Sequence, residues 1–456
     1  MVTGILALGS PQVGREFKQP PERESSRGDG RRIGLELPEE FCAMFPVKCH
    51  VTHLESPVDG TRFAPGIPHG THLGRPLLVS YDLEGIRRVV NTEVLRQRPA
   101  GLWRYRELLP LPADQPPISL GEGPTPLLNC PRLGNALGVP GLVIKDESLL
   151  PTGSFKSRGM SVAVSMAAWL GLRRLAAPTA GNAGGALAAY CARAGMEALV
   201  FMPEDTPVVN RLEAILYGAR VYLVNGLIHE CGALVRDNAE ACSWFDMSTL
   251  REPYRLEGKK TMGLELADQR EWTLPDVILY PTGGGTGLLG MDKAFRELRE
   301  LGWLREEKMP RFYACQSSGC PPLARAWNQN SKHAETVRDA KTRASGLRVP
   351  AAVGDFLILD AVRASGGMAV EADEDRMDFQ MRRACSLEGI AVCPETAICL
   401  EALENLVRSG TIGAEEDVLV WNTGAAQKYV ECLEASASRV DRNKPLQPQL
   451  GFPPVR

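Results

Sequence analysis

The chain turns from a strand into a helix at Pro151-Thr152-Gly153-Ser154-Phe155-Lys156-Ser157-Arg158-Gly159. An apolar strand-length run, 142–144, precedes this loop, and a helix is predicted over 157–170. The proline and the glycine form a turn that presents Ser154 and Lys156 at the helix start. The positive end of the helix dipole disfavours a charged lysine there, which suggests a neutral amine ready to form a Schiff base. A solvated surface lysine is the alternative that this loop alone leaves open.

The alternation of strands and helices continues through the chain after Leu120. Such alternation predicts parallel strands covered by helices on both faces, which is an α/β fold. Ligands of these sheets bind at the carboxyl ends of the strands, so functional residues are expected in the loops there. The predicted strands are 142–144, 175–177, 198–202, 220–224, 277–280, 312–314 and 418–421, and the predicted helices are 157–170, 184–194, 210–217 and 288–301.

Composition and charge argue against several classes of protein. The net charge of -3 offers no basic surface to nucleic acid, and no apolar run reaches the ~18 residues of a membrane-spanning helix. Neither nucleic acid nor a membrane is therefore expected as a partner. Twelve cysteines without a Cys-x-x-Cys pair favour reduced thiols and a cytoplasmic protein. Cys49 lies near paired histidines, His50/His53 and His69/His72, but these spacings do not match a closed zinc site and no metal is expected.

A glycine-rich loop, Thr282-Gly283-Gly284-Gly285-Thr286-Gly287, follows an apolar strand and precedes the helix predicted at 288–301. Backbone N–H groups can converge on an anion there, so the loop predicts a phosphate cradle. A tight strand–helix turn is the structural alternative. Gly285, Gly287 and Gly290 also satisfy the dinucleotide pattern Gly-x-Gly-x-x-Gly. The next predicted strand ends without the ribose-binding acid of that pattern, so a nicotinamide or flavin site is disfavoured.

Two further loops follow predicted strands. The loop Thr179-Ala180-Gly181-Asn182-Ala183 has backbone N–H groups suited to a carboxylate, and Asn182 can hydrogen-bond a phenolic oxygen. In Trp421-Asn422-Thr423-Gly424-Ala425 the Thr423 hydroxyl could bond a pyridine nitrogen, although an ordinary helix cap is equally consistent. The phosphate-binding loop of kinase-like proteins and the Gly-x-Ser-x-Gly elbow of lipase-like proteins are both absent.

In this order, the four loops resemble the threonine synthase family of fold-type-II pyridoxal-phosphate enzymes. The resemblance runs from about Leu120 to about Tyr429. It includes three more segments, which are Leu120-Gly121-Glu122-Gly123-Pro124-Thr125-Pro126-Leu127, Lys145-Asp146-Glu147 and Tyr254-Arg255-Leu256-Glu257-Gly258-Lys259-Lys260-Thr261. It implies two lobes, each with a mostly parallel twisted sheet flanked by helices. The implied divisions are a flexible tail at 1–45, an extension of short strands and turns at 46–118, a large cofactor-binding lobe at 119–155 and 260–435, a smaller lobe at 156–259, and a tail at 436–456.

The resemblance also assigns roles to individual residues. Lys156 would hold pyridoxal 5'-phosphate through an imine and would shuttle protons. Asn182 would contact the 3-hydroxyl oxygen of the cofactor, and Thr423 its pyridine nitrogen. The cofactor phosphate would lie against Gly283, Gly284, Gly285, Thr286 and Gly287. The substrate would contact Ser154, Thr179, Ala180, Gly181, Asn182 and Ala183.

The implied reaction is that of a carbon–oxygen lyase, which converts O-phospho-L-homoserine and water to L-threonine and phosphate. A small amino acid is therefore the expected partner, and a homodimer is a family-level expectation. Departures from the family pattern include Ser157, where many members carry Asp, and Ala425-Ala426-Gln427 in the last loop. Two alternatives stay open: a serine or threonine dehydratase or related β-elimination or β-replacement lyase, and a non-catalytic cofactor-binding protein.

Overall fold

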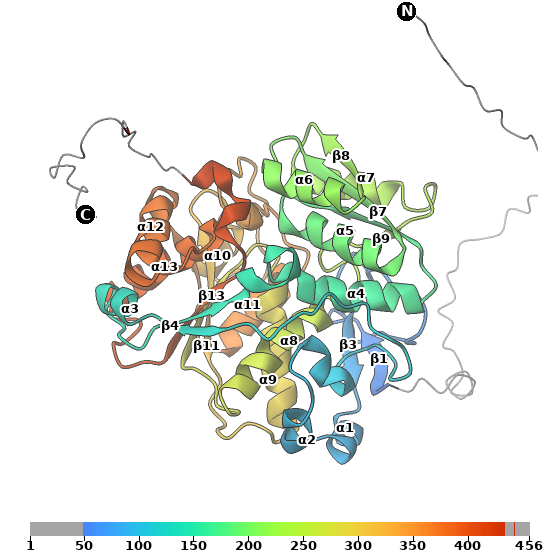
Figure 1. Ribbon diagram of the computed structural model, residues 1–456, viewed down its shortest axis with the longest axis horizontal. Coiled ribbons are helices and arrows are strands. Elements are labelled where there is room, and N and C mark those ends of the chain that lie inside the picture. Colours follow the sequence, from blue (N-terminus) through green and yellow to red (C-terminus); the bar gives the residue numbers. More distant parts are fainter. Residues whose placement is uncertain (1–48, 434–441, 443–456) are drawn as a thin grey trace, which may run out of the picture. The chain divides into compact units, whose positions relative to one another are not determined.

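The computed structural model describes residues 49–433 and Arg442. The predicted tails at 1–45 and 436–456 therefore lie outside the described residues, apart from Arg442. The strands, labelled in Figure 1, are β1 (Val51–Glu55), β2 (Arg62–Phe63), β3 (Leu78–Tyr81), β4 (Leu127–Asn129), β5 (Val143–Asp146), β6 (Arg174–Pro178), β7 (Glu197–Pro203), β8 (Arg220–Val224), β9 (Phe245–Asp246), β10 (Val277–Pro281), β11 (Arg311–Ser317), β12 (Met368–Ala372) and β13 (Val418–Asn422).

Helices connect most of these strands. They are α1 (Leu83–Val89), α2 (Thr92–Arg96), α3 (Pro131–Leu137), α4 (Lys156–Trp169), α5 (Asn182–Ala194), α6 (Val208–Leu216), α7 (Ile228–Asp237), α8 (Tyr254–Gln269), α9 (Thr286–Glu300), α10 (Pro322–Asn328), α11 (Asp355–Ala364), α12 (Met377–Glu388) and α13 (Pro394–Arg408). Among the helices of the described ranges, none is both long and apolar enough to cross a bilayer.

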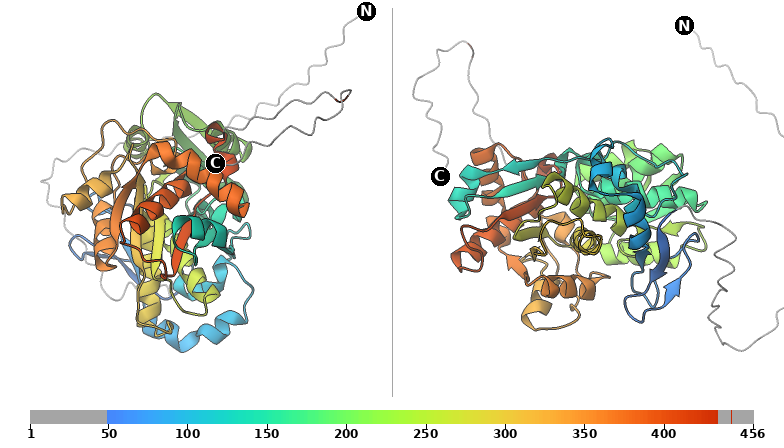
Figure 2. Two further views of the ribbon diagram at one scale, coloured as in Figure 1. Left: turned by 90° about the vertical axis from the view of Figure 1, so that its left-hand side faces the viewer. Right: turned by 90° about the horizontal axis from the view of Figure 1, so that it is seen from below.

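The larger sheet has six strands in the order β12-β11-β10-β13-β5-β4. Its strands are parallel except β4, which runs antiparallel to β5. Successive side chains of a strand point to opposite faces. Accordingly, Ile278 and Tyr280 of β10 pack in a core with α8, α9 and α11, whereas Val277 and Leu279 pack in a second core with α3, α12 and α13. The sheet is thus covered on both faces, as Figure 2 shows from two further sides.

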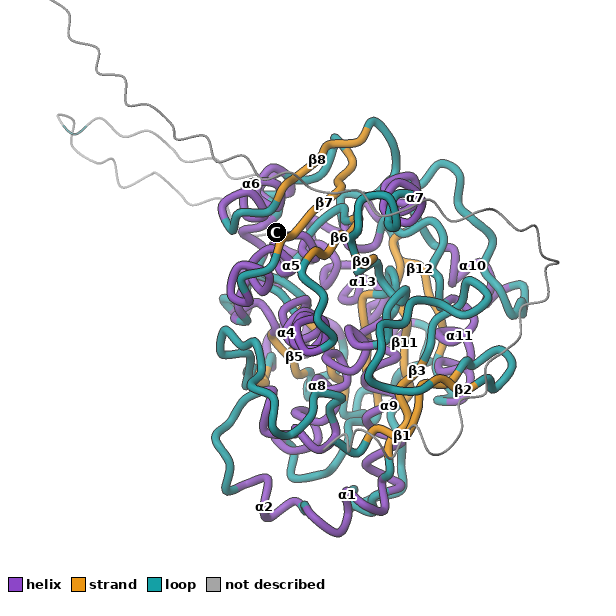
Figure 3. Tube along the Cα trace, turned by 90° about the vertical axis from the view of Figure 1, so that its right-hand side faces the viewer, coloured by secondary structure: helices purple, strands orange, loops and turns teal. Residues whose placement is uncertain are grey.

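The smaller sheet has four parallel strands in the order β8-β7-β6-β9. One face packs against α4 and α5, where Val162 and Leu187 are fully buried. The other face meets α7 through Val235. Figure 3 shows these strands with α5, α6 and α7 around them. Two mostly parallel sheets flanked by helices confirm the predicted fold class, while the exact lobe boundaries remain a prediction.

A third, antiparallel sheet has the order β2-β1-β3 and lies in the predicted extension. That segment also contains α1 and α2, so it is not made of strands and turns alone. Both helices begin at a polar cap, because Asp82 accepts from the N–H of Gly85 and Asn91 accepts from the N–H of Val94. Within residues 49–433, no group of three or more His, Cys, Asp or Glu side chains comes together as a metal site would require.

Candidate cofactor site

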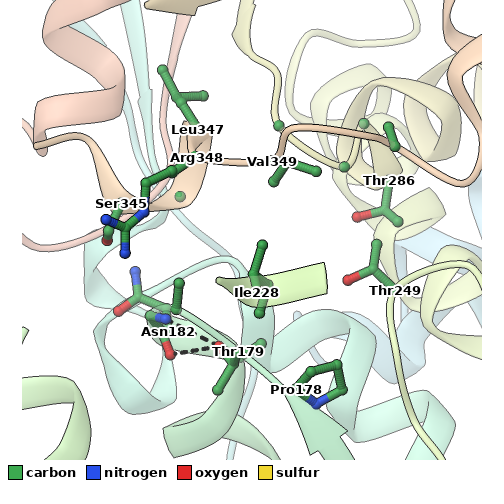
Figure 4. A pocket seen from close by; sticks show the side chains of 18 of the residues that line it. Pro178, Thr179, Asn182, Ile228, Thr249, Thr286, Ser345, Leu347, Arg348 and Val349 are labelled. Carbon is green, nitrogen blue, oxygen red and sulfur yellow. Dashed lines mark hydrogen bonds between the residues drawn. The ribbon is translucent and has the colours of Figure 1, made fainter. Parts of the chain in front are cut away.

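A cavity of about 400 Å³ lies where the loops after β6, β10 and β13 meet the start of α4. Figure 4 shows Thr249 and Thr286 facing it from one side and Asn182 and Arg348 from another. Its walls include most of the residues predicted from sequence, namely Lys156, Thr179, Ala180, Gly181, Asn182, Ala183, Gly283, Gly284, Gly285, Thr286 and Thr423. Loops separated by more than a hundred residues thus share one cavity. Ser154 and Gly287 are buried next to it without lining it.

Lys156 is the first residue of α4 and is half-buried. Its loop is fastened to the loop after β13, because the N–H of Phe155 donates to the carbonyl of Thr423 at 3.0 Å and the N–H of Ala425 donates to the carbonyl of Gly153 at 2.9 Å. Burial, followed by the positive charge of Arg255, lowers the pKa of Lys156 to about 7, against the opposing effect of Glu395. A substantial fraction of this amine is therefore unprotonated at neutral pH.

Two glycines next to the turn between β10 and α9 have no room for a side chain. A Cβ on Gly283 would overlap the carbonyl oxygen of Gly346, and one on Gly287 would overlap the Tyr280 hydroxyl. Gly285 caps α9 with φ of 72°, in the left-handed region that favours glycine. The backbone therefore approaches the cavity closely, and the N–H groups at the start of α9 are available to an anion.

Asn182, the first residue of α5, donates from Nδ2 to the Tyr429 hydroxyl at 2.9 Å. Its Oδ1 is buried without a hydrogen-bond partner, and so is the hydroxyl of Ser345. The Thr179 hydroxyl donates to the carbonyl of Gly181 at 3.0 Å, which shapes the loop before α5 (Figure 4). The Thr423 hydroxyl lies 3.5 Å from the Cys393 sulfur. The cavity therefore offers polar groups that a bound molecule can satisfy.

These features fit pyridoxal phosphate. A lysine with a depressed pKa can bond an aldehyde, and a helix start behind glycines suits a phosphate arm. The family model described as "Pyridoxal-phosphate dependent enzyme" matches residues 118–424.

The chain belongs to this family of pyridoxal-phosphate dependent enzymes.

Within that family, several threonine synthases are similar to this chain over most of its length. It is 33% identical to threonine synthase of Methanocaldococcus jannaschii, covering 78% of this chain and 87% of the relative. It is 30% identical to the chloroplastic threonine synthase 2 of Arabidopsis thaliana, covering 83% of this chain and 75% of the relative. These matches place it among the threonine synthases, as the sequence motifs predicted.

Solved structures support the same fold. Maize serine racemase is similar with a TM-score of 0.57 and 20% identity, covering 66% of this chain and 88% of that one. Diaminopropionate ammonia lyase from Escherichia coli has a TM-score of 0.59 and 17% identity, covering 69% of this chain and 88% of that one. At this level of identity the similarity shows the architecture of the pyridoxal-phosphate enzyme and not its substrate.

Several residues of the cavity were missed in the sequence. They are Thr249, Arg251, Ser345, Arg348, Glu395 and Tyr429. Glu395 is 4% exposed and accepts from the N–H of Gly346 at 2.8 Å. An acid in the first turn of a helix such as α13 is ordinary, because it complements the helix dipole. The sequence position of Glu395 therefore did not indicate a place at the cavity. Only the packing of α13 behind the cavity shows that Glu395 lies there.

Proposed function

We propose that this enzyme is a threonine synthase that converts O-phospho-L-homoserine and water to L-threonine and phosphate. The observation that carries the proposal is the meeting of Lys156 with the glycine loop in one cavity, in a chain whose relatives are named threonine synthases. Pyridoxal phosphate, when bound, supplies an electron sink for carbanion chemistry on an amino acid. The protein itself binds and orients the cofactor and the substrate, and it moves protons.

Lys156 is assigned to hold the cofactor and to carry protons to and from the substrate. A pKa of about 7 suits both tasks, because the amine can lose and regain a proton near neutral pH. The N–H groups of 283–287 are assigned to the cofactor phosphate, and Asn182 to its phenolic oxygen. The Thr423 hydroxyl is assigned to the pyridine nitrogen. A neutral hydroxyl there leaves that nitrogen without an added proton.

The substrate carries a carboxylate and a phosphate, and the cavity has groups suited to both. The loop 179–183 is assigned to the carboxylate, with Ser154 supporting the loop that faces it. Three arginines line the cavity. Of these, Arg236 lies 2.9 Å from Asp237, and Arg348 is held by Asp205 at 2.6 and 2.7 Å. The guanidinium of Arg251, which also lines the cavity, has no ion-pair partner among residues 49–433. Its free positive charge favours a doubly negative substrate.

We place the enzyme in the cytoplasm as a homodimer acting on a small amino acid. The cysteines of the described residues are all unpaired, which favours a reducing compartment. The homodimer is expected from the family resemblance. Size-exclusion chromatography with light scattering measures the oligomeric state directly.

Product analysis tests the proposed reaction. The purified enzyme is supplied with O-phospho-L-homoserine, L-threonine and L-serine in separate assays, and both inorganic phosphate and 2-ketoacid are measured. We expect stoichiometric phosphate and threonine from the first substrate. Rapid ketoacid formation from threonine or serine, without phosphate release from O-phospho-L-homoserine, would instead identify a dehydratase.

The same assay with Lys156→Ala tests the site. Because no other cavity-lining residue is a lysine, we expect the visible absorbance of lysine-bound cofactor and the turnover to disappear together. Normal absorbance and turnover in this variant would contradict the assignment of Lys156 while leaving the reaction itself open to the product assay.

A further inference from the structure

A tyrosine hydroxyl lies at the cavity beside the loop 179–183. Tyr429 follows β13, between the short 3-10 helices Ala426–Lys428 and Val430–Cys432, and is 2% exposed. It lines the cavity together with all five residues of the loop 179–183. The Nδ2 of Asn182 donates to its hydroxyl oxygen at 2.9 Å, so this hydroxyl is fixed directly at that loop.

The segment around Tyr429 is anchored on two sides of the cavity. The neighbouring Lys428 lies 2.6 Å from Glu213 of α6, and it donates to the carbonyl of Thr152, in the loop before α4, at 2.8 Å. The N–H of Tyr429 itself donates to the carbonyl of Ala426 at 2.9 Å. The tyrosine is therefore carried by a backbone that is already held in place, and ordering its side chain costs little when a ligand binds.

The hydroxyl of Tyr429 keeps its hydrogen and can donate it. Burial first, and then the negative charge of Glu395, hold the pKa of Tyr429 well above its ordinary value of 10, so the phenol is protonated at neutral pH. Its oxygen accepts from Asn182, but among residues 49–433 no acceptor lies within hydrogen-bond distance of its own hydrogen. One carboxylate oxygen of Glu395 accepts from the N–H of Gly346, and the other has no hydrogen-bond partner.

The geometry of Asn182 decides which part of a ligand this hydrogen can reach. An amide NH₂ group directs its two hydrogens about 120° apart, so its two acceptors lie about 5 Å from each other. If one hydrogen of Nδ2 goes to Tyr429 and the other to the phenolic oxygen of the cofactor, the tyrosine hydroxyl is too far from that oxygen to bond it. The substrate carboxylate is the other anionic group that is assigned to this loop.

We propose that Tyr429 donates a hydrogen bond to the α-carboxylate of the amino-acid substrate and so selects ligands that carry this group. The inference rests on the proposed function, which assigns the loop 179–183 to the carboxylate. The N–H groups at the start of α5 lack partners within the helix, so they and the tyrosine hydroxyl can hold one carboxylate between them. A donor at this point also offsets the negative charge of Glu395, which otherwise repels a carboxylate.

The binding of two non-reacting ligands to the cofactor-loaded protein tests the inference. The first ligand is the phosphonate analogue of O-phospho-L-homoserine, in which CH₂ replaces the ester oxygen so that no phosphate is released. The second is the same compound without its carboxylate. Isothermal titration calorimetry measures both affinities. In Tyr429→Phe we expect the first ligand to bind roughly ten-fold more weakly, or weaker still, and the second to bind as it does to the unaltered protein.

Tyr254→Phe is the matched control. The hydroxyl of Tyr254 is also buried without a hydrogen-bond partner for its hydrogen among the described residues, but this side chain does not line the cavity. We expect both affinities to remain unchanged in this variant. Melting curves show whether each variant is folded, and both should be, because each substitution retains the aromatic ring.

A role in which Tyr429 only braces Asn182 predicts another result, because the loss of that bond disturbs both ligands alike. If Tyr429→Phe binds the two phosphonates equally weakly, or binds both normally, the inference is wrong. A changed visible absorbance of the cofactor without any ligand would place the hydroxyl at the phenolic oxygen instead. If the unaltered protein binds neither phosphonate, the proposed substrate fails, and L-norvaline and butylamine then provide the same comparison for Tyr429.

Discussion

At the scale of single residues, the glycines of the loop 283–287 are held by what surrounds them. Gly283 lies against the backbone of Gly346 and Gly287 against Tyr280, so neither position has space for a methyl group. Gly284 differs, because its nearest neighbour is the side-chain methyl of Thr249, which would be 2.9 Å from an added Cβ. Gly284 is thus the position of this loop where a substitution tests charge with the least disturbance of the backbone.

Gly284→Asp should weaken cofactor retention. The new carboxylate would crowd Thr249 and repel the phosphate that the loop is proposed to hold. We expect at least a roughly ten-fold higher dissociation constant for pyridoxal phosphate, corresponding to about 1.4 kcal/mol, measured by equilibrium dialysis. Gly141→Asp adds the same charge where a Cβ meets nothing within 4 Å and should retain normal affinity. Equal affinities in the two variants would place the phosphate elsewhere.

At the scale of elements, buried charges connect β5, α4 and α8. Arg158 of α4 contacts Glu147 and Glu265, and Lys145 of β5 contacts Glu265 at 2.6 Å. All four side chains are at most 3% exposed. The helix that carries Lys156 is therefore anchored through charge-assisted hydrogen bonds in addition to apolar packing. Since each charge is paired, the loss of one partner leaves another buried charge uncompensated.

Glu265→Gln should destabilise the protein by about 3–5 kcal/mol, because Arg158 and Lys145 lose their shared carboxylate. Urea unfolding measures this difference. The exposed carboxylate of Glu84, 3.0 Å from Arg87, provides the control, and Glu84→Gln should change stability by less than about 1 kcal/mol. Similar effects from the two substitutions would mean that the buried cluster adds little.

The contribution of the same cluster to the stability of the protein depends on pH. Burial alone would raise the pKa of Glu265, but Arg158 and Lys145 lower it to about 2 from the ordinary value of 4.5. A folded-state pKa below the unfolded one contributes stability above pH 4.5, and this contribution is lost as the pH falls through about 2. The unaltered protein should therefore lose more free energy of unfolding than Glu265→Gln over that interval.

At the scale of the whole molecule, the cavity lies in the described part of the unit that spans 47–456. Its walls come from segments that belong to both large sheets. The loop before α5 follows a strand of the four-stranded sheet, and the glycine loop follows a strand of the six-stranded sheet. A molecule bound there contacts both sheets. It binds the folded chain only, since the unfolded chain does not bring these loops together.

Removal of the cofactor should accordingly lower the melting temperature, and addition of pyridoxal phosphate should restore it. At a free concentration one hundred times the dissociation constant, the expected stabilisation is about 2.7 kcal/mol. Differential scanning calorimetry of the two forms measures the change. Lys156→Ala should gain less from the same addition, because it lacks the amine that bonds the aldehyde. A melting temperature indifferent to pyridoxal phosphate would contradict binding at this cavity.

Local patterns in the sequence predicted the fold class and eleven of the residues that line the cavity. Strand-length apolar runs predicted β8 at its observed bounds and β7 within two residues, because alternation and turn residues are properties of neighbouring positions. The glycine run and the lysine loop were found in the same way. β12 and α13 were missed among the predicted elements, as their apolar residues form less regular runs between charged ones.

Tertiary structure alone decided which charged residues are buried and what they face. The segment of α8, Tyr254–Gln269, contains enough Lys, Arg, Glu and Asp to suggest a solvated helix, yet most of it is buried. Its charges are tolerated because their partners come from β5, α4 and α9, far away in the chain. Electrostatic energy depends on the distance between charges and on the absence of water, neither of which is written in the order of residues.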